Sequence, residues 1–144
     1  MEMVGVVYAS RATKEMLPEE IDRLLVSARS YNASVGVSGM LLYGRKQFFQ
    51  YFEGMRQDVD DVYERVRRSS LHSDILELEN APIPHRVFNR WFMGFSEAPE
   101  SVLQTLSQEQ WSRERPWMES HETTSDGLRR LLAFIDESSV QQGT

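Results

Sequence analysis

The sequence predicts an α+β domain of ferredoxin-like topology, in which one sheet carries two helices on one of its faces. Short β-branched or aromatic segments alternate along the chain with two segments whose apolar residues recur every three or four positions. Their order is β-α-β-β-α-β-β, which is the split βαβ arrangement with one extra strand. With 144 residues, of which 40% are hydrophobic, the chain has enough apolar material for one core of this kind.

The first strand and the first helix are expected within residues 4–32. Residues 4–9 (VGVVYA) are apolar and rich in valine, and the two-residue period of a strand gives three side chains one face: Val4, Val6 and Tyr8. Pro18 suits the first turn of a helix. The apolar face of that helix has the spacing i, i+3, i+4, i+7 in Ile21, Leu24, Leu25 and Ala28. We expect the helix to end near Asn32, before Gly36.

A β-hairpin is expected next. Residues 37–43 (VSGMLLY) and 47–53 (QFFQYFE) have the composition of strands, and the residues between them, Gly44-Arg45-Lys46, form a tight turn. On the second strand Gln50 points to the same side as Phe48 and Phe52. Because the first and third strands are central neighbours in the predicted topology, Tyr8 and Gln50 are expected to lie side by side.

The second half of the domain is predicted to contain a helix and two strands. Asp58 is expected to cap the helix, whose apolar residues again have helical spacing: Val59, Val62, Tyr63 and Val66. The strands are expected at residues 75–78 and 90–96, and Pro82 and Pro84 break the chain between them. On the last strand the period of two places three side chains on one face: Trp91, Met93 and Phe95.

The remaining third of the chain is more polar. A short helix is expected at residues 101–106 and a clearer amphipathic helix at residues 126–135, with Trp111 and Trp117 in the link. We therefore expect a domain in residues 1–98 and a C-terminal helical extension in residues 99–144, which packs on the sheet or forms an oligomer interface. The last 45 residues or so are too few for an effector enzyme domain, so no enzymatic activity is expected.

Composition and charge exclude several other functions. The net charge of −6 disfavours binding to nucleic acid or to anionic membranes, since both require a basic face. The absence of cysteine excludes disulfides and cysteine–metal sites. The three histidines lack metal-ligand spacing and are interpreted as surface or capping residues: His72, His85 and His121. No signal peptide or membrane-spanning run of about 20 apolar residues is evident, so a cytoplasmic protein is expected.

Gln50 is the least expected residue of the strands, because it interrupts a run of aromatic side chains. A buried amide without partners costs roughly 1–3 kcal/mol, so it must be satisfied, exposed or bound to a ligand. Taken singly, Tyr8 is explained as a core tyrosine and Asn32 as a helix C-terminal residue. Trp91 and Met93 are explained in the same way as ordinary core residues.

Taken together, five stretches in this order resemble the BLUF family of FAD-binding blue-light photoreceptors. They are VVYAS with Tyr8, SYNASVGVSGMLLY with Asn32, FFQYFEG with Gln50, Tyr63–Arg65 in the second helix, and APIPHRVFNRWFMGF with Trp91 and Met93. The resemblance extends from about Val4 to Glu97. It implies a sensor domain that binds FAD non-covalently and signals to a downstream partner protein, and we expect it to form a homo-oligomer.

The resemblance also implies a role for each matching residue. The flavin ring would lie between the two helices against four apolar side chains: Leu24, Leu25, Val62 and Val66. Asn32 would bind the polar edge of the ring, and Arg65 its carbonyl edge or the ribityl chain. Gln50 would stand between Tyr8 and the N5 and O4 atoms, so that light-driven electron and proton transfer from Tyr8 rearranges the hydrogen bonds. Trp91 and Met93 would relay this change.

Some positions depart from the family, and other hypotheses remain open. The stretch Ser69–His72 lacks an Asp and an Arg that members often carry, Tyr31 stands where they often have Asn or His, and Ala28 removes a possible hydroxyl near the ring. One alternative is a ferredoxin-like protein-interaction module without a light-switching flavin. Another is an acylphosphatase-type enzyme that holds phosphate with Arg11. The residues around the ring do not decide between FAD and FMN.

Overall fold

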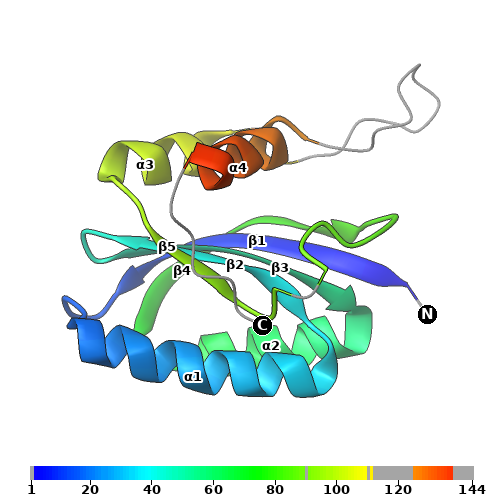
Figure 1. Ribbon diagram of the computed structural model, residues 1–144, viewed down its shortest axis with the longest axis horizontal. Coiled ribbons are helices and arrows are strands. Elements are labelled where there is room, and N and C mark those ends of the chain that lie inside the picture. Colours follow the sequence, from blue (N-terminus) through cyan, green and yellow to red (C-terminus); the bar gives the residue numbers. More distant parts are fainter. Residues whose placement is uncertain (1, 90, 110, 112–124, 138–144) are drawn as a thin grey trace.

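The computed structural model describes residues 2–89, 91–109, 111 and 125–137, so Arg90, Trp117 and His121 lie outside the described residues. Within these ranges five strands and two helices follow the predicted order, and two further helices come after them (Figure 1). The elements are β1 (Met3–Ala12), α1 (Pro18–Val35), β2 (Ser38–Gly44), β3 (Gln47–Met55), α2 (Arg56–Arg68), β4 (His72–Pro82), β5 (Gly94–Glu97), α3 (Glu100–Gln108) and α4 (Asp126–Glu137). The predicted ferredoxin-like fold is confirmed.

The five strands form one sheet in the order β4-β1-β3-β2-β5. The β5 strand runs parallel to β2, and the other neighbouring strands are antiparallel. Strands β1 and β3 are therefore central neighbours, as predicted. Their register makes Tyr8 and Gln50 direct cross-strand partners, which brings the two side chains to the same face of the sheet.

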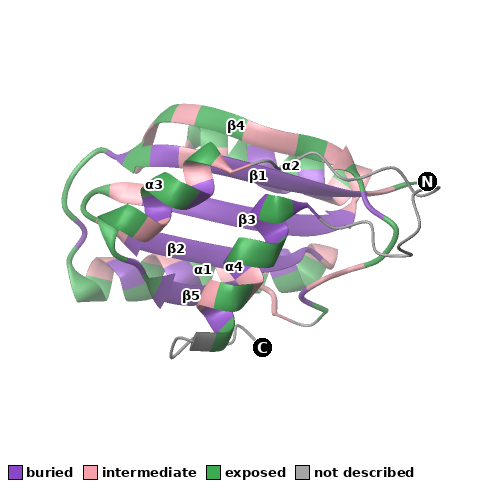
Figure 2. Cartoon of the chain, turned by 90° about the horizontal axis from the view of Figure 1, so that it is seen from above, coloured by how far each residue is buried: buried purple, intermediate pink, exposed green. Residues whose placement is uncertain are grey.

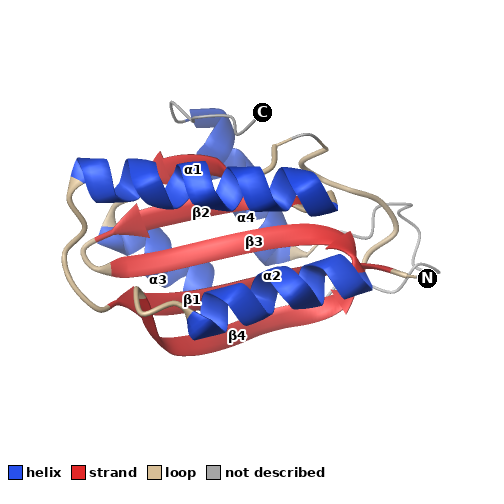
Figure 3. Cartoon of the chain, turned by 90° about the horizontal axis from the view of Figure 1, so that it is seen from below, coloured by secondary structure: helices blue, strands red, loops and turns tan. Residues whose placement is uncertain are grey.

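The molecule has three layers, with the sheet in the middle. Helices α1 and α2 lie along one face of the sheet, which Figure 3 shows from below, and α3 and α4 lie on the other (Figures 1 and 3). The alternation of side chains along β3 supplies both cores. Phe48 and Phe52 pack on the side of α1 and α2, whereas Phe49 and Tyr51 pack with Leu103 and other residues of the second layer. Figure 2 shows the central strands buried beneath α3 and α4, while the edge strand β4 contains only exposed and half-buried residues.

Two helix boundaries differ from the prediction. Helix α1 continues to Val35 and ends at Gly36, whose φ of 72° is in the left-handed region. Asn32 therefore lies inside the last turn and is not the residue that ends the helix. Helix α2 begins at Arg56, with Met55 at its N-cap, so Asp58 lies in the first turn and is not the cap.

The last predicted strand is wrong in its first half. Strand β5 contains only Gly94–Glu97, and a loop leads to it from the end of β4 at Pro82. Without a regular strand, the two-residue period no longer holds for the residues before Gly94. Met93 packs in the core beneath α1, whereas Trp91 packs against the core of the α3 and α4 layer. The prediction that Trp91 and Met93 share a face is therefore wrong.

None of the helices in the described part of the chain is long and apolar enough to cross a membrane.

The close contact of β2 with β3 can be tested at Gly39. A Cβ atom there would come within 2.1 Å of the Tyr51 carbonyl oxygen and 2.7 Å of Phe52 Cα, both in the backbone of β3. Because backbone cannot move aside cheaply, we expect Gly39→Ala to lower the free energy of unfolding by about 3 kcal/mol or more. Urea denaturation measures this change.

Gly36→Ala is the matched control. Its Cβ would meet nothing nearer than 3.8 Å, so only the left-handed backbone opposes the change. We expect a loss of about 1 kcal/mol in that variant. A Gly39→Ala protein as stable as Gly36→Ala would contradict the strand contact described here.

Candidate functional site

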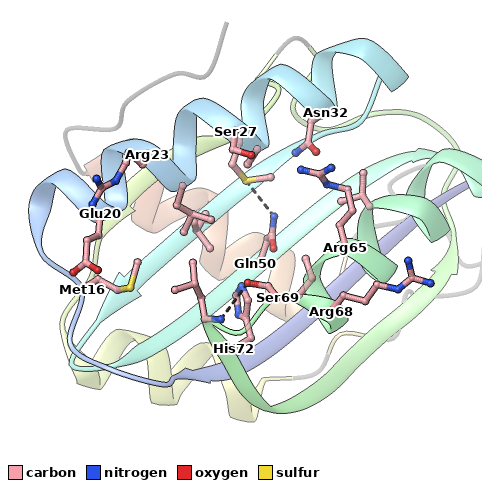
Figure 4. Close-up of a pocket in the computed structure, with 17 residues that line it drawn as sticks. Met16, Glu20, Arg23, Ser27, Asn32, Gln50, Arg65, Arg68, Ser69 and His72 are labelled. Carbon is pink, nitrogen blue, oxygen red and sulfur yellow. Dashed lines mark hydrogen bonds between the residues drawn. The ribbon is translucent and has the colours of Figure 1, made fainter.

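A cavity of about 580 Å³ opens between α1 and α2 on the face of the sheet. Its volume lies within the range of about 300–1,000 Å³ that is usual for small-molecule sites. Side chains from both helices, from the sheet and from the residues around the start of β4 line it (Figure 4). The lining includes eight residues that bear on the chemistry of the site: Leu24, Asn32, Gln50, Val62, Arg65, Val66, His72 and Met93.

Gln50 lines the cavity, and a hydrogen bond between two strands joins it to Tyr8, which is buried behind it and is not among the lining residues. The hydroxyl of Tyr8, on β1, donates to Oε1 of Gln50, on β3. Tyr8 is fully buried, and this burial raises the pKa of its phenol far above the usual value, with a smaller contribution from Tyr63. Tyr63 stacks on the Tyr8 ring with 5.9 Å between the centroids. In its resting state Tyr8 is therefore a neutral phenol that is hydrogen-bonded to a proton acceptor, Oε1 of Gln50.

The other end of the Gln50 amide is held weakly. Its Nε2 donates to the sulfur of Met93 at 3.2 Å, and Figure 4 shows Gln50 at the centre of the cavity with this bond drawn. A thioether is a weak acceptor compared with an amide or carboxylate oxygen. Gln50 also lines the cavity, so a ligand with stronger donors and acceptors can compete for the amide.

Asn32 and Arg65 lie at one end of the cavity in Figure 4. The Asn32 amide donates to the carbonyl oxygen of Phe92 at 3.0 Å, and among the described residues no donor meets its Oδ1 atom. The Arg65 guanidinium lies 4.0 Å from the centroid of the Tyr31 ring. Tyr31 therefore supports Arg65 by a cation–π contact. The sequence analysis, which noted Tyr31 only as a departure from the family, did not predict this role.

The structure places the remaining predicted residues in different surroundings. Leu24, Val62 and Val66 line the cavity and give it apolar walls. Leu25 is buried in the core next to the cavity but is not among the residues that line it. Trp91 is also absent from the lining, because it packs on the opposite side of the sheet near Phe88, with 5.8 Å between the ring centroids.

Sequence reasoning missed His72, which is not a surface residue. It lines the cavity, forms a 2.8 Å hydrogen bond with the Ser10 hydroxyl, and has its ring 4.6 Å from that of Phe48. Burial lowers the pKa of His72 to about 4, so the imidazole is neutral at physiological pH. An earlier start of β4 would have revealed this position. A strand predicted to begin at His72 places this side chain beside the end of β1.

These features suit a planar aromatic ligand with polar edges. Aliphatic side chains contribute to the walls, two amides and three guanidinium groups offer donors and acceptors, and both the lining His72 and the buried Tyr8 behind Gln50 are uncharged. The described residues contain no cluster of three or more His, Cys, Asp or Glu that could hold a metal ion. The residues present therefore fit a flavin ring, and they do not point to metal chemistry within the described part of the chain.

Comparison with known proteins supports this interpretation. Residues 3–94 match the model of the BLUF family, described as sensors of blue-light using FAD. The chain is 30% identical over 105 residues to the photoactivated adenylate cyclase subunit beta of Euglena gracilis. That match covers 72% of this chain and 12% of the relative, so the chain spans about an eighth of that protein's length.

Solved structures agree with the sequence comparison. The dark-state structure of BlrB, described as a BLUF protein, has a TM-score of 0.66 and 28% identity, covering 74% of this chain and 83% of that one. The ground state of BlsA has a TM-score of 0.67 and 26% identity, covering 94% of this chain and 86% of that one. The matched residues include the Tyr8–Gln50 pair and most of the cavity. The chain belongs to the BLUF family of blue-light sensors that use FAD.

Proposed function

We propose that this protein binds FAD non-covalently between α1 and α2 and senses blue light through Tyr8 and Gln50. The observation that carries the proposal is the hydrogen bond from the buried Tyr8 hydroxyl to Oε1 of Gln50, whose amide lines the cavity. It joins a possible electron donor to a proton acceptor, and the same amide faces the space that the ring would occupy. The walls formed by Leu24, Val62 and Val66 would hold the ring, and Asn32 and Arg65 would bind its polar edges.

The residues around the ring favour one photochemical path. Bound flavin supplies a strong one-electron oxidant when it absorbs blue light. Tyr8 would be the electron donor, because its phenol is hydrogen-bonded to the Gln50 amide that lines the cavity, and a phenol that loses an electron becomes a strong acid. Its proton then moves along the existing hydrogen bond to Oε1 of Gln50, and the return of electron and proton restores neutral Tyr8.

Gln50 is the residue that can record this event. An amide has two donors and one acceptor group, so a rotated amide presents its NH₂ group where its oxygen was. The weak bond to the Met93 sulfur costs little to exchange, unlike a bond to a carboxylate. Two arrangements of a buried hydrogen-bond network provide a bistable switch.

Output would pass through the loop before β5. Met93 contacts the Gln50 amide, and Trp91, two residues earlier, packs against the core of the α3 and α4 layer. We propose that residues 1–98 form the sensor and residues 99–144 an extension that transmits the change to a partner protein or to a second copy. In this proposal the protein is a cytoplasmic signalling protein and not an enzyme.

The proposed switch can be tested by Gln50→Leu. We expect purified wild-type protein with FAD to show a small reversible red shift after blue light. Leucine keeps the volume of the side chain but removes the proton acceptor, so the variant should bind FAD and show no shift. Visible absorption spectra before and after illumination measure this.

Gln47→Leu is the matched control, because it makes the same change on the same strand at a residue that does not line the cavity. It should keep the full shift. A reversible shift that persists in Gln50→Leu would refute the mechanism, and wild-type protein that binds no flavin would favour a protein-interaction module.

Tyr8 is tested by Tyr8→Phe. The phenylalanine ring fills the same space but lacks the hydroxyl that donates to Gln50, so we expect bound FAD, bright flavin fluorescence and no red shift. Tyr43→Phe is the control, because Tyr43 is also buried but its hydroxyl accepts from the Met16 amide. Time-resolved fluorescence should show quenching in wild type and Tyr43→Phe alone. Equal quenching in Tyr8→Phe would exclude Tyr8 as the electron donor.

His72 predicts an acid limit for the sensor. Its pKa is about 4 in the folded protein and about 6.5 in an unfolded chain, so the unfolded state binds more protons between these values. Stability from this residue is complete above pH 6.5 and falls by up to about 3 kcal/mol as the pH drops to 4. Denaturation of wild type and His72→Gln across this range should show a flatter profile in the variant. His85→Gln, which changes an exposed histidine, should follow the wild-type profile.

A further inference from the structure

Glu53 is a buried carboxylate that the proposed photochemistry does not use. It lies near the end of β3, on the face of the sheet opposite the cavity, and its exposed fraction is 0%. Two side-chain hydroxyls donate to it, that of Tyr51 at 3.0 Å and that of Ser38 at 3.0 Å. Two backbone amides do so as well, those of Val87 at 2.8 and 2.9 Å and of Phe88 at 2.7 Å.

A buried carboxylate needs such partners, since an unpaired one costs several kcal/mol. The two backbone donors are the unusual part of this set. They do not belong to the hairpin that carries Glu53 but to the loop between β4 and β5, more than thirty residues away along the chain. Arg86, from the same loop, also reaches the Ser38 hydroxyl at 3.1 Å and the Glu53 backbone oxygen at 3.4 Å. Glu53 therefore fixes the middle of this loop to the sheet.

The same loop ends at the cavity. Gly39 donates its backbone N–H to the Trp91 carbonyl at 2.7 Å, and Asn32 donates to the Phe92 carbonyl at 3.0 Å. The next residue is Met93, whose sulfur accepts from Gln50. Phe88 connects the two ends, because its carbonyl accepts from the Trp91 amide at 2.9 Å. Glu53 thus holds the backbone at Phe88, five residues before Met93, whose sulfur accepts from Gln50.

We propose that Glu53 is a positioning residue for the light sensor: it anchors the loop between β4 and β5 so that Met93 meets Gln50, and it thereby sets the lifetime of the light state. The inference rests on the proposed function. Glu53 does not touch the ring or Tyr8, so it has no part in electron transfer. It acts on the rate at which the surroundings of Gln50 return to the dark arrangement.

Glu53→Gln tests this role. The variant keeps the size of the side chain but replaces one acceptor with an NH₂ donor, which then faces a donor, the Val87 amide. We expect the red shift to form with its normal size, because Tyr8 and Gln50 are unchanged. We expect dark recovery to be about tenfold faster than in wild type, since a loosened loop lowers the barrier to rearrangement. Absorption recorded after a blue flash measures both quantities.

Tyr51→Phe is the matched control. It removes one donor from the same carboxylate and leaves both loop amides in place, so its recovery should stay within about twofold of wild type. Thermal denaturation of both variants separates kinetics from general destabilisation. Recovery in Glu53→Gln that matches wild type, or acceleration in Tyr51→Phe equal to that in Glu53→Gln, would overturn the proposal.

A measurement on the wild type tests the anchor, on which the proposal depends, even if Glu53→Gln does not fold. Hydrogen exchange of the Val87 and Phe88 amides should be equally slow in the dark and under continuous blue light, because the anchor holds in both states. Exchange at these amides that is fast in either state would overturn the proposal. A wild-type protein without a reversible red shift would instead refute the proposed function, and the exchange in the dark would still report on the anchor.

Discussion

The hydrogen bond between Tyr8 and Gln50 is the interaction around which the rest of the structure is arranged. It needs two strands that are distant in sequence to be central neighbours in exact register, and the antiparallel pairing of β1 with β3 supplies this. It also needs a dry environment, which the stacked Tyr63 ring and the apolar side chains of α2 around Tyr8 provide. In such an environment a hydrogen bond is strong and an unpaired polar group is costly. A buried phenol and amide therefore hold one another in place until a ligand or light changes the balance.

Much of this arrangement could be predicted from the sequence, because it follows local periodicity. The two-residue period correctly gave the faces of β1 and β3, and helical spacing gave α1 and α2. The failures occur where tertiary contacts decide. The strand predicted at residues 90–96 begins only at Gly94: before it, the Trp91 amide donates to the Phe88 carbonyl, and the carbonyls of Trp91 and Phe92 accept from Gly39 and Asn32. His72 was missed because β4 is a polar edge strand whose first residues carry no apolar alternation.

The loop before β5 gives the two sides of the sheet a covalent connection. Side chains on opposite faces of a regular sheet are separated by the backbone of the strands, and a change on one face has no direct contact with the other. Here the chain passes the sheet between Trp91 and Met93, so neighbouring residues serve different layers. A shift of Met93 moves the backbone that Trp91 shares. In the proposed switch, this connection is the path by which a small change at Gln50 would reach α3 and α4 without disturbing the central strands.

The distribution of charge separates the buried groups around Gln50 from the exposed rim of the cavity. His72 in the lining and Tyr8 behind Gln50 are neutral, since burial raises the pKa of Tyr8 and lowers that of His72. The arginines of the lining, Arg23, Arg65 and Arg68, are instead exposed residues of α1 and α2. Water screens the field of an exposed cation, whereas a charge on a buried group would act on Tyr8 and on bound flavin with much less screening. In the proposed function, neutral groups around Gln50 keep the energy of electron transfer from Tyr8 independent of pH over the physiological range, while Arg68 pairs with Glu64 at the exposed rim of the cavity.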